Sequence, residues 1–324
     1  MIMENSNLTT KWQLLSNESL HNGFRALRID ALCIPELFIA LDTTNCPCLL
    51  LFADDDDDFV FKGSDKEKIS LSINLTSQVI IIKLKEASYI DLFNDLIISI
   101  YNRVHQISDN KTCVEEFVYS FYKWAEFFEE PENHRLSTDQ VKGLIGELFY
   151  LNEILKSSKP ENIDDLLDSW VGPYETSNDF VFEQKNIELK TKDFNSETIR
   201  ISSEYQLEAE PLKTVELVVI SMQKNYVNGV TISELILNCS TLIRGNFGNI
   251  SIFLKALRQL GLTPESSVDY DNLKFQILQM NTYSCTEESF PKLTSVSIPF
   301  GLSNVKYSLN TKTIEAFLIE EKKY

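Results

Sequence analysis

Three residues near the middle of the chain have the types and spacing of a metal-assisted site. Asp179 begins a short apolar stretch, and Glu188 and Lys190 follow it in the run Ile187–Thr191 (IELKT). Two carboxylates at one place provide the hard oxygen ligands of Mg²⁺, which takes one or two of them and keeps several waters. A lysine beside such an ion can orient a water molecule, or stabilise charge that develops on a phosphate.

These side chains meet only if two strands bring them together. Phe180–Phe182 and Ile187–Thr191 are predicted to be strands joined by a polar turn. Side chains two positions apart in a strand share a face, so Glu188 and Lys190 point the same way, and a hairpin would bring Asp179 alongside Glu188. Because an acid and a lysine flanked by apolar residues are costly to bury without partners, the pattern favours a functional pair.

With an acidic helix before them, these residues resemble the active-site pattern of the PD-(D/E)XK phosphodiesterase superfamily, which has the restriction-endonuclease-like fold. In that pattern an acid on the first core helix, an Asp at the start of a strand and a (D/E)xK on the next strand form one site. The helix here is expected over residues 138–156. The resemblance implies that Glu147 supplies its acid and that Asp179, Glu188 and Glu147 hold Mg²⁺ or Mn²⁺. It also implies that Lys190 orients the attacking water.

A longer arrangement is similar to a group of bacterial PD-(D/E)XK proteins that tend to accompany restriction or anti-phage defence genes. It consists of GLIGELFYL around Glu147, then Trp170–Pro173, Asp179, IELKT and ISSEYQL, and it covers about residues 136–210. Asn178 stands where the pattern often has proline. Gln206 resembles a glutamine that some members place after the ExK strand, which makes it an accessory candidate. The resemblance implies a metal-dependent endonuclease acting on DNA in a defence context.

Two glycines suggest how the expected helix could approach the sheet. Inside a helix each glycine costs about 1 kcal/mol relative to alanine, so Gly143 and Gly146 need a reason. Gly143 and Glu147 are four residues apart and share a face with Gly146 and Tyr150. Small residues on that face would let the helix lie close to the sheet and bring Glu147 within reach of Asp179.

Three alternatives stay open. An ExK motif is common by chance, and acid–lysine neighbours recur here, as in Glu183-Gln-Lys185. Glu188 and Lys190 could therefore form an ion pair on a solvated face. The chain could also be a non-catalytic acidic interaction subunit, or a DNA-mimic scaffold of a defence complex, that docks through residues 1–130. Finally, it could keep the fold and lack the chemistry. Convergence of Glu147, Asp179, Glu188 and Lys190 in one cleft would favour the enzyme.

Other chemistries lack their motifs. The sequence contains no GxxxxGK[ST] phosphate loop, no GxSxG and no dinucleotide-binding glycine pattern. Its three histidines lie far apart, which argues against a His-rich zinc site and an HNH nuclease. Its six cysteines include no CxxC pair and are expected to be reduced.

Charge is unevenly distributed along the 324 residues. There are 30 Lys and Arg against 48 Asp and Glu, a net charge of −18. Residues 1–180 hold 15 basic and 31 acidic residues, a net of −16, whereas residues 181–324 hold 15 and 17, a net of −2. This imbalance argues against a bulk basic DNA-binding surface. Weak intrinsic affinity for the DNA substrate is therefore expected, with a partner protein of the defence system binding residues 1–130.

The remaining charged residues predict little by themselves. The run Asp54–Asp58 is expected to be a solvated loop and not a metal site. Scattered basic residues could line a surface that faces phosphates, although such residues are usually only solvated: Lys190, Lys192, Arg200, Arg244, Lys255 and Arg258. The loop Arg244–Gly248 is a weak DNA-contact candidate. No apolar run is long enough for a membrane span and no secretory signal is visible, so a cytoplasmic protein is expected.

The pattern predicts the α/β class, with a restriction-endonuclease-like mixed central sheet flanked by helices and a β-rich N-terminal domain. The expected domains are residues 1–90, which are mostly β, a helical connector at 91–133, and a nuclease-like core with a C-terminal helical and β extension at 134–324. Further strands are expected at Phe24–Asp30, Leu37–Asp42, Cys48–Ala53, Ile69–Leu75, Val79–Lys85, Ile199–Ser203, Val215–Met222, Phe275–Met280 and Leu293–Leu309. Further helices are expected at 92–104, Val114–Phe128, Thr231–Leu242 and Ile250–Leu260.

Overall fold

The computed structural model describes residues 5–15, 23–53, 61–129, 135–174 and 176–324. The chain divides into two compact units, Met1–Glu130 and Pro131–Tyr324. The run Asp54–Asp58 lies outside the described residues. Within the described ranges, every helix is too short or too polar to cross a membrane.

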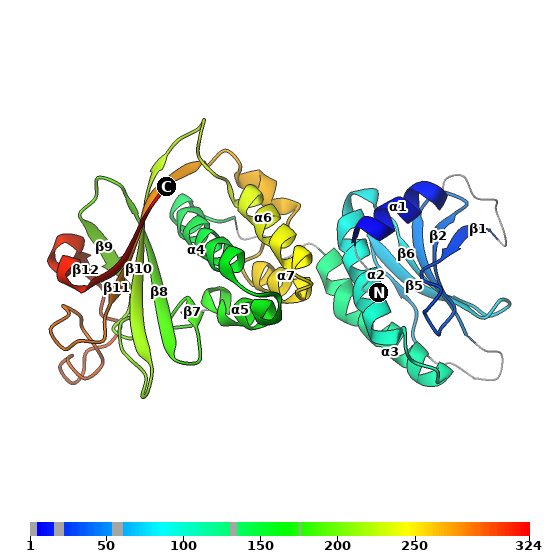
Figure 1. Ribbon diagram of the computed structural model, residues 1–324, viewed down its shortest axis with the longest axis horizontal. Coiled ribbons are helices and arrows are strands. Elements are labelled where there is room, and N and C mark those ends of the chain that lie inside the picture. The colour runs from blue at the N-terminus through cyan, green and yellow to red at the C-terminus, as the bar shows by residue number, and fades with distance from the viewer. Residues whose placement is uncertain (1–4, 16–22, 54–60, 130–134, 175) are drawn as a thin grey trace. The chain divides into compact units, whose positions relative to one another are not determined.

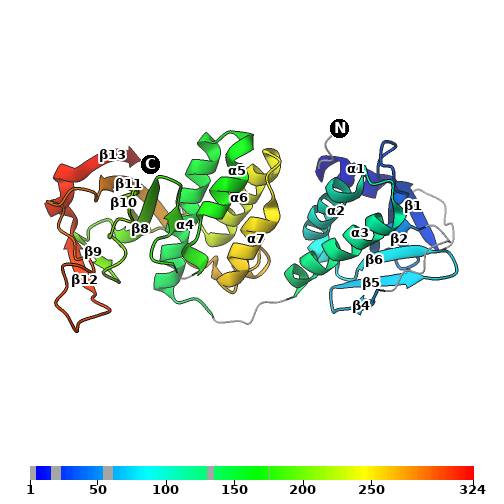
Figure 2. The ribbon, with the colours of Figure 1, turned by 90° about the horizontal axis from the view of Figure 1, so that it is seen from below.

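The first unit is a six-stranded antiparallel sheet with helices against one face (Figures 1 and 2). Its strand order is β1-β2-β3-β6-β5-β4. The strands are β1 (Phe24–Arg28), β2 (Leu37–Asp42), β3 (Pro47–Phe52), β4 (Ser64–Asp65), β5 (Ile69–Asn74) and β6 (Val79–Leu84). The helices are α1 (Asn5–Leu15), α2 (Ile90–Val104) and α3 (Asn110–Ala125), with 3₁₀ helices η1 (Ala87–Tyr89) and η2 (Glu126–Phe128). The expected connector thus supplies α2 and α3, which lie within this unit.

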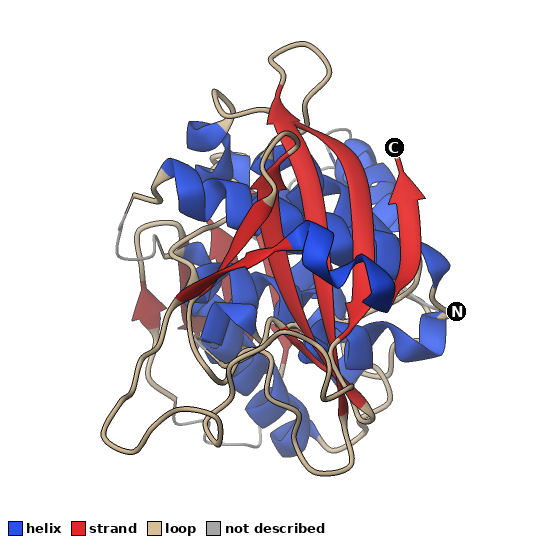
Figure 3. Cartoon of the chain, turned by 90° about the vertical axis from the view of Figure 1, so that its left-hand side faces the viewer, coloured by secondary structure: helices blue, strands red, loops and turns tan. Residues whose placement is uncertain are grey.

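The second unit is built on a mixed five-stranded sheet of order β13-β11-β10-β8-β7 (Figure 3). Its strands are β7 (Phe180–Val181), β8 (Lys185–Asp193), β10 (Thr214–Lys224), β11 (Phe275–Ser284) and β13 (Leu318–Lys323). β8 and β10 are parallel, and the other neighbours are antiparallel. The prediction of an α/β restriction-endonuclease-like fold with a mixed central sheet and a β-rich N-terminal region is confirmed.

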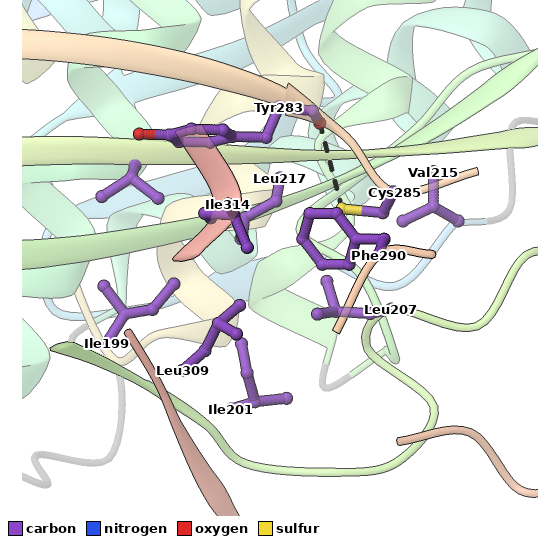
Figure 4. Close-up of a cluster of buried hydrophobic side chains, with 11 residues drawn as sticks. Ile199, Ile201, Leu207, Val215, Leu217, Tyr283, Cys285, Phe290, Leu309 and Ile314 are labelled. Atoms are coloured by element: carbon purple, nitrogen blue, oxygen red, sulfur yellow. Dashed lines mark hydrogen bonds between the residues drawn. The ribbon is translucent and has the colours of Figure 1, made fainter. Parts of the chain in front are cut away.

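Different elements cover the two faces of this sheet (Figures 1 and 3). Helices cover one face: α4 (Thr138–Ser157), α5 (Ile163–Ser169), α6 (Ile232–Gly245) and α7 (Ile250–Gln259), with 3₁₀ helices η3 (Pro160–Asn162), η4 (Gly172–Tyr174) and η5 (Ser266–Tyr270). A two-stranded sheet covers the other face: β9 (Thr198–Ile201) and β12 (Tyr307–Asn310), with 3₁₀ helix η6 (Thr311–Phe317). Buried side chains such as Val215 and Leu217 of β10 fill the space beneath β9 and β12 (Figure 4).

Helix α4 begins at a capping box and lies close to β8. Ser137 accepts a hydrogen bond from the backbone N–H of Gln140, and the Gln140 side chain accepts one from Ser137 in return. A Cβ on Gly146 would overlap Thr191 Cγ2 and lie 3.0 Å from Leu189 Cδ2. The close approach predicted for this glycine is therefore confirmed. Outside the adjoining backbone of α4, no described atom would lie within 4 Å of a Cβ on Gly143, so the same prediction is wrong for Gly143.

The sequence predictions also fail at several elements, including the short strand β4, which was not predicted. Helices α1 and α5 and strand β13 were not predicted. The strand expected over Leu293–Leu309 is wrong for most of its length, because only the part from Tyr307 lies in a strand, β12. Pro299 has no N–H to donate to a ladder, and Gly301 and Asn304 adopt positive φ values of 92° and 58°. These backbone features prevent a continuous strand.

Candidate active site

A short hairpin places Asp179 beside the ExK strand. Phe180 pairs with Ile187, and the N–H of Asp179 donates to the Ile187 carbonyl at 3.1 Å. β7 has only two residues, so its pairing with β8 ends there. The next outward N–H of β8, that of Leu189, donates to Asp179 Oδ2 at 2.7 Å. The Asp179 carboxylate thus accepts the hydrogen bond that a longer β7 strand would have accepted. This bond fixes the position of Asp179 relative to Glu188, the residue before Leu189.

Glu147 is directed toward this hairpin by a tryptophan. Trp170 Nε1 donates a hydrogen bond to Glu147 Oε2 at 2.8 Å. The Trp170 side chain is buried, forms a β-bridge with Phe180 through its backbone, and packs on Phe253 of α7 with ring centroids 5.9 Å apart. Because Trp170 contacts both the hairpin and the helical layer, its N–H is a fixed donor for the glutamate.

Gly172 marks the space where two carboxylates meet. A Cβ at this position would lie 2.7 Å from Glu147 Oε2 and 3.2 Å from Asp179 Oδ1. The N–H groups of Val171 and Gly172 both donate to the Asp179 carbonyl at 2.9 Å, which holds this segment against the hairpin. The oxygens of Glu147 and Asp179 therefore face the same small space, which the missing side chain of Gly172 leaves open.

Glu188 and Lys190 form a largely buried pair. Lys190 Nζ lies 2.6 Å from Glu188 Oε1, and the side chains are 17% and 1% exposed. Among the residues that the structure describes, Lys190 is the one partner of the Glu188 carboxylate. Their partners in β10 are Leu217 and Val219, whose side chains lie in the apolar cluster of Figure 4. A carboxylate in such surroundings is destabilised unless a cation neutralises it.

Burial raises the pKa values of all three acids, and the charge of Asp179 raises those of Glu147 and Glu188 further. Burial and then the charge of Asp179 raise the pKa of Glu147 to about 8, although the Trp170 bond and Lys190 lower it. Burial raises the pKa of Asp179, against the effects of the Leu189 N–H and Lys190. Burial and then Asp179 raise the pKa of Glu188 well above its usual range. Three acids with raised pKa values near one lysine are typical of functional sites.

The donor set fits a hard divalent cation. Glu147 and Asp179 offer oxygens to one open space, and Mg²⁺ usually takes one or two carboxylates with water in its other positions. The Glu188 carboxylate, whose partner within the described residues is Lys190, is a further source of negative charge nearby. Within the part of the chain that the structure describes, no three Asp, Glu, His or Cys side chains already surround one point. The fit therefore rests on the pair Glu147 and Asp179, with Glu188 engaged by Lys190.

Gln206, the accessory candidate, lies in a loop that supports the hairpin. Its side-chain oxygen accepts a hydrogen bond from the Ser202 N–H at 2.8 Å, so the amide is engaged within its own loop. Its backbone carbonyl accepts a hydrogen bond from Asn178 Nδ2, also at 2.8 Å. Gln206 thus contacts the neighbour of Asp179, and these contacts give it a supporting place beside the acids.

Two residues of this site had no role in the sequence analysis. Trp170 and Gly172 appeared only as part of the Trp170–Pro173 segment of the resemblance. The structure gives them contacts with Glu147, which is 23 residues away from Trp170. The sequence signal for these two residues was a glycine two positions after a tryptophan. Their contact with Glu147 of α4 could not be predicted from the spacing along the chain.

Comparison with known proteins gives one match. A family model described as "Putative PD-(D/E)XK family member, (DUF4420)" matches residues 8–312. This match spans both units and includes Glu147, Asp179, Glu188 and Lys190. No curated protein and no solved structure matches the chain.

Proposed function

The chain belongs to the PD-(D/E)XK-type family DUF4420, and from this membership we propose that it is a nuclease that hydrolyses phosphodiester bonds in DNA with Mg²⁺ or Mn²⁺. The observation that carries the proposal is the shared space beside Gly172. Glu147 and Asp179 both present oxygens to it, and the Glu188–Lys190 pair lies on the strand to which Asp179 is hydrogen-bonded. These residues combine carboxylate oxygens that can hold a metal ion with a lysine that can bind a phosphate.

Each side chain has a proposed part in the reaction. Asp179 and Glu147 would hold the ion, with Glu188 as a third carboxylate once Lys190 turns from it toward the substrate. When bound, the ion supplies Lewis acidity and lowers the pKa of its water. Lys190 would orient the attacking water and stabilise negative charge on the phosphate in the transition state. Trp170 would keep Glu147 aimed at the ion, because a fixed N–H donor holds one carboxylate oxygen.

The biological setting is part of the proposal. The similarity to bacterial proteins of restriction and anti-phage defence loci supports a defence role. The net charge of −16 over residues 1–180 makes that half poorly suited to DNA, because backbone binding depends on Lys and Arg neutralising phosphates. We therefore infer a partner protein of the same defence system that binds residues 1–130.

A cleavage assay with a matched lysine control tests this function. Plasmid, single-stranded DNA and RNA are incubated with the chain in Mg²⁺, Mn²⁺ or EDTA, and products are separated on a gel. Lys190→Ala should abolish cleavage. Lys185→Ala should cleave as wild type does, because Lys185 lies on the same strand but pairs with Glu216 at 2.8 Å. Absence of cleavage in every metal, together with no uptake of Mn²⁺, would instead support a non-catalytic acidic interaction subunit.

A further inference from the structure

Positive charge gathers at the end of β8 beyond the candidate site. Lys192 follows Lys190 by two residues, so both side chains lie on the strand face that carries Glu188. Lys142 of α4 reaches the same end of the strand, where its Nζ lies 2.6 Å from Asp193 Oδ1. Asp193 directly follows Lys192, so both lysines lie at this end of β8, and burial and then the charge of Lys142 lower the pKa of Lys192. Two close cations are unusual in a chain of net charge −18.

The ammonium group of Lys192 is held in place by the turn that follows the strand. Its Nζ donates hydrogen bonds to the carbonyls of Ser196 at 2.8 Å and of Phe194 at 3.3 Å. A lysine ammonium has three donors, so these two bonds leave one for a ligand. A positioned cation loses less conformational entropy on binding than a freely moving one does.

An exposed aromatic residue, Phe194, directly follows β8 at the same end of the strand. The N–H of Phe194 donates to the Met222 carbonyl at 2.9 Å, which completes the last β8–β10 pair, Asp193 with Met222. Phe194 is the first residue of the turn after β8, which the Ser196 N–H closes on the Asp193 carbonyl at 2.8 Å, and its own carbonyl lies 3.3 Å from Lys192 Nζ. Phe194 is 48% exposed, so its ring is open to an incoming flat group.

We propose that Lys142, Lys192 and Phe194 form a binding track for a single strand of nucleic acid, which leads to the candidate active site. The lysines bind a backbone phosphate, and the Phe194 ring stacks on an unpaired base. Proteins that bind single strands combine basic residues with exposed aromatic rings in this way. The inference rests on the proposed nuclease function, because it takes the strand to Lys190 for cleavage, and it narrows the substrate to single-stranded nucleic acid.

Asp193 provides a variant that should tighten nucleic-acid binding, whereas the other variants should weaken it. Its carboxylate is 73% exposed and pairs with Lys142, whose side chain is 15% exposed. A phosphate that approaches the lysines meets this negative charge. Replacing Asp193 by asparagine should therefore tighten binding several-fold, whereas removing the lysines or the ring should weaken it. If these residues had only structural roles, Asp193→Asn would not improve binding.

The experiment measures binding separately from cleavage. Fluorescence anisotropy of a labelled oligothymidine is recorded in EDTA at several salt concentrations, with full-length variants whose melting is first compared with wild type. Lys142→Gln with Lys192→Gln should weaken binding and reduce the salt slope by about 0.7 for one lost phosphate contact. Phe194→Ala should weaken binding about tenfold and leave the salt slope unchanged, because stacking releases no counterions.

Matched controls and outcomes separate the two proposals. Lys159→Gln, Phe300→Ala and Glu183→Gln change an exposed lysine, phenylalanine and acid elsewhere in the second unit and should bind as wild type does. If wild type cleaves but the track variants bind and cleave normally, the track is wrong and the nuclease proposal stands. If the track variants behave as expected but no metal supports cleavage, the proposed function fails and the track remains a binding site. Duplex bound more tightly than a single strand, or no binding by wild type, would overturn the track.

Discussion

Lys190 Nζ lies 2.6 Å from Glu188 Oε1, and a catalytic lysine and a lysine that only forms this ion pair should respond differently to mutation. If Lys190 acts on the transition state, Lys190→Ala should abolish cleavage and leave the fold and Mn²⁺ binding in place. Asp179→Asn should weaken both cleavage and Mn²⁺ binding, because the ion loses one of few anionic ligands. Isothermal titration with Mn²⁺ beside the nuclease assay checks this. Cleavage at the wild-type rate by Lys190→Ala would show that the proposed site is wrong.

Gly172 permits a prediction in which the site and the fold respond differently. In Gly172→Ala the new Cβ would lie 2.7 Å from Glu147 Oε2, which is the mobile end of a side chain. The glutamate can swing away at little cost to stability, but it then leaves the Trp170 N–H and the space shared with Asp179. We expect a melting temperature close to wild type, with Mn²⁺ affinity and cleavage reduced at least tenfold. Unchanged Mn²⁺ affinity would remove this space from the metal site.

Among the site residues, the sequence predicted those that lie close to one another along the chain. Glu188 and Lys190 follow from the period of a strand, and Asp179 follows from the hairpin. Glu147 came from the family resemblance, since no spacing links a helix to a strand 40 residues later. Trp170 and Gly172 were missed because their contacts with Glu147 exist only after the helix and the hairpin pack. The catalytic roles of all these residues stay predictions until the variants are measured.

At the scale of elements, α4 and β8 carry the most information. The capping residues before α4 and the alternation within β8 are local signals, and both elements were predicted within a few residues of their bounds. α5 has only seven residues, too few for a reliable helical period. β13 is exposed along its length and has two apolar residues followed by four charged ones, so it lacks the apolar alternation that marks a strand. Elements of these kinds depend on tertiary contacts that the sequence does not display.

The two glycines of α4 predict stability changes of opposite sign. Gly146→Ala should destabilise the second unit by about 1–3 kcal/mol, because the new Cβ overlaps the branched Thr191 side chain of β8. Gly143→Ala is the matched control in the same helix. With no atom within 4 Å of its new Cβ, it should stabilise by about 0.5–1 kcal/mol through the helix preference of alanine. Urea unfolding of both variants measures the difference. Equal effects would mean that α4 does not pack on β8 through Gly146.

At the scale of the whole molecule, negative charge opposes folding and substrate binding alike. The net charge of −18 sets a general repulsion that grows as carboxyl groups ionise. In the second unit the carboxyl groups of Glu147, Asp179 and Glu188 also oppose folding locally when they ionise, since all three have raised pKa values. A divalent cation at these acids would relieve that repulsion, so we expect pH and metal to act together on stability.

The sign of the pH effect follows from the raised pKa values. Between the ordinary carboxyl pKa, about 4.3, and the folded pKa of Glu147, about 8, the unfolded chain binds fewer protons than the folded chain does. Stability without metal should therefore fall as pH rises through this window. At a Mg²⁺ or Mn²⁺ concentration 100 times the dissociation constant, binding should restore about 2.7 kcal/mol at pH 8 and little at pH 5, where the acids are protonated.

Thermal melts at pH 5 to 8, with and without Mn²⁺, measure this coupling, and a pair of variants separates the site from the general charge. Glu147→Gln should reduce both the loss of stability with pH and the gain from Mn²⁺, because the amide does not ionise. Glu183→Gln removes one equivalent charge from an exposed turn position of the same unit and should leave both effects as in wild type. If the two variants respond alike, the pH dependence comes from the overall charge, and Glu147 has no special part in holding a metal ion.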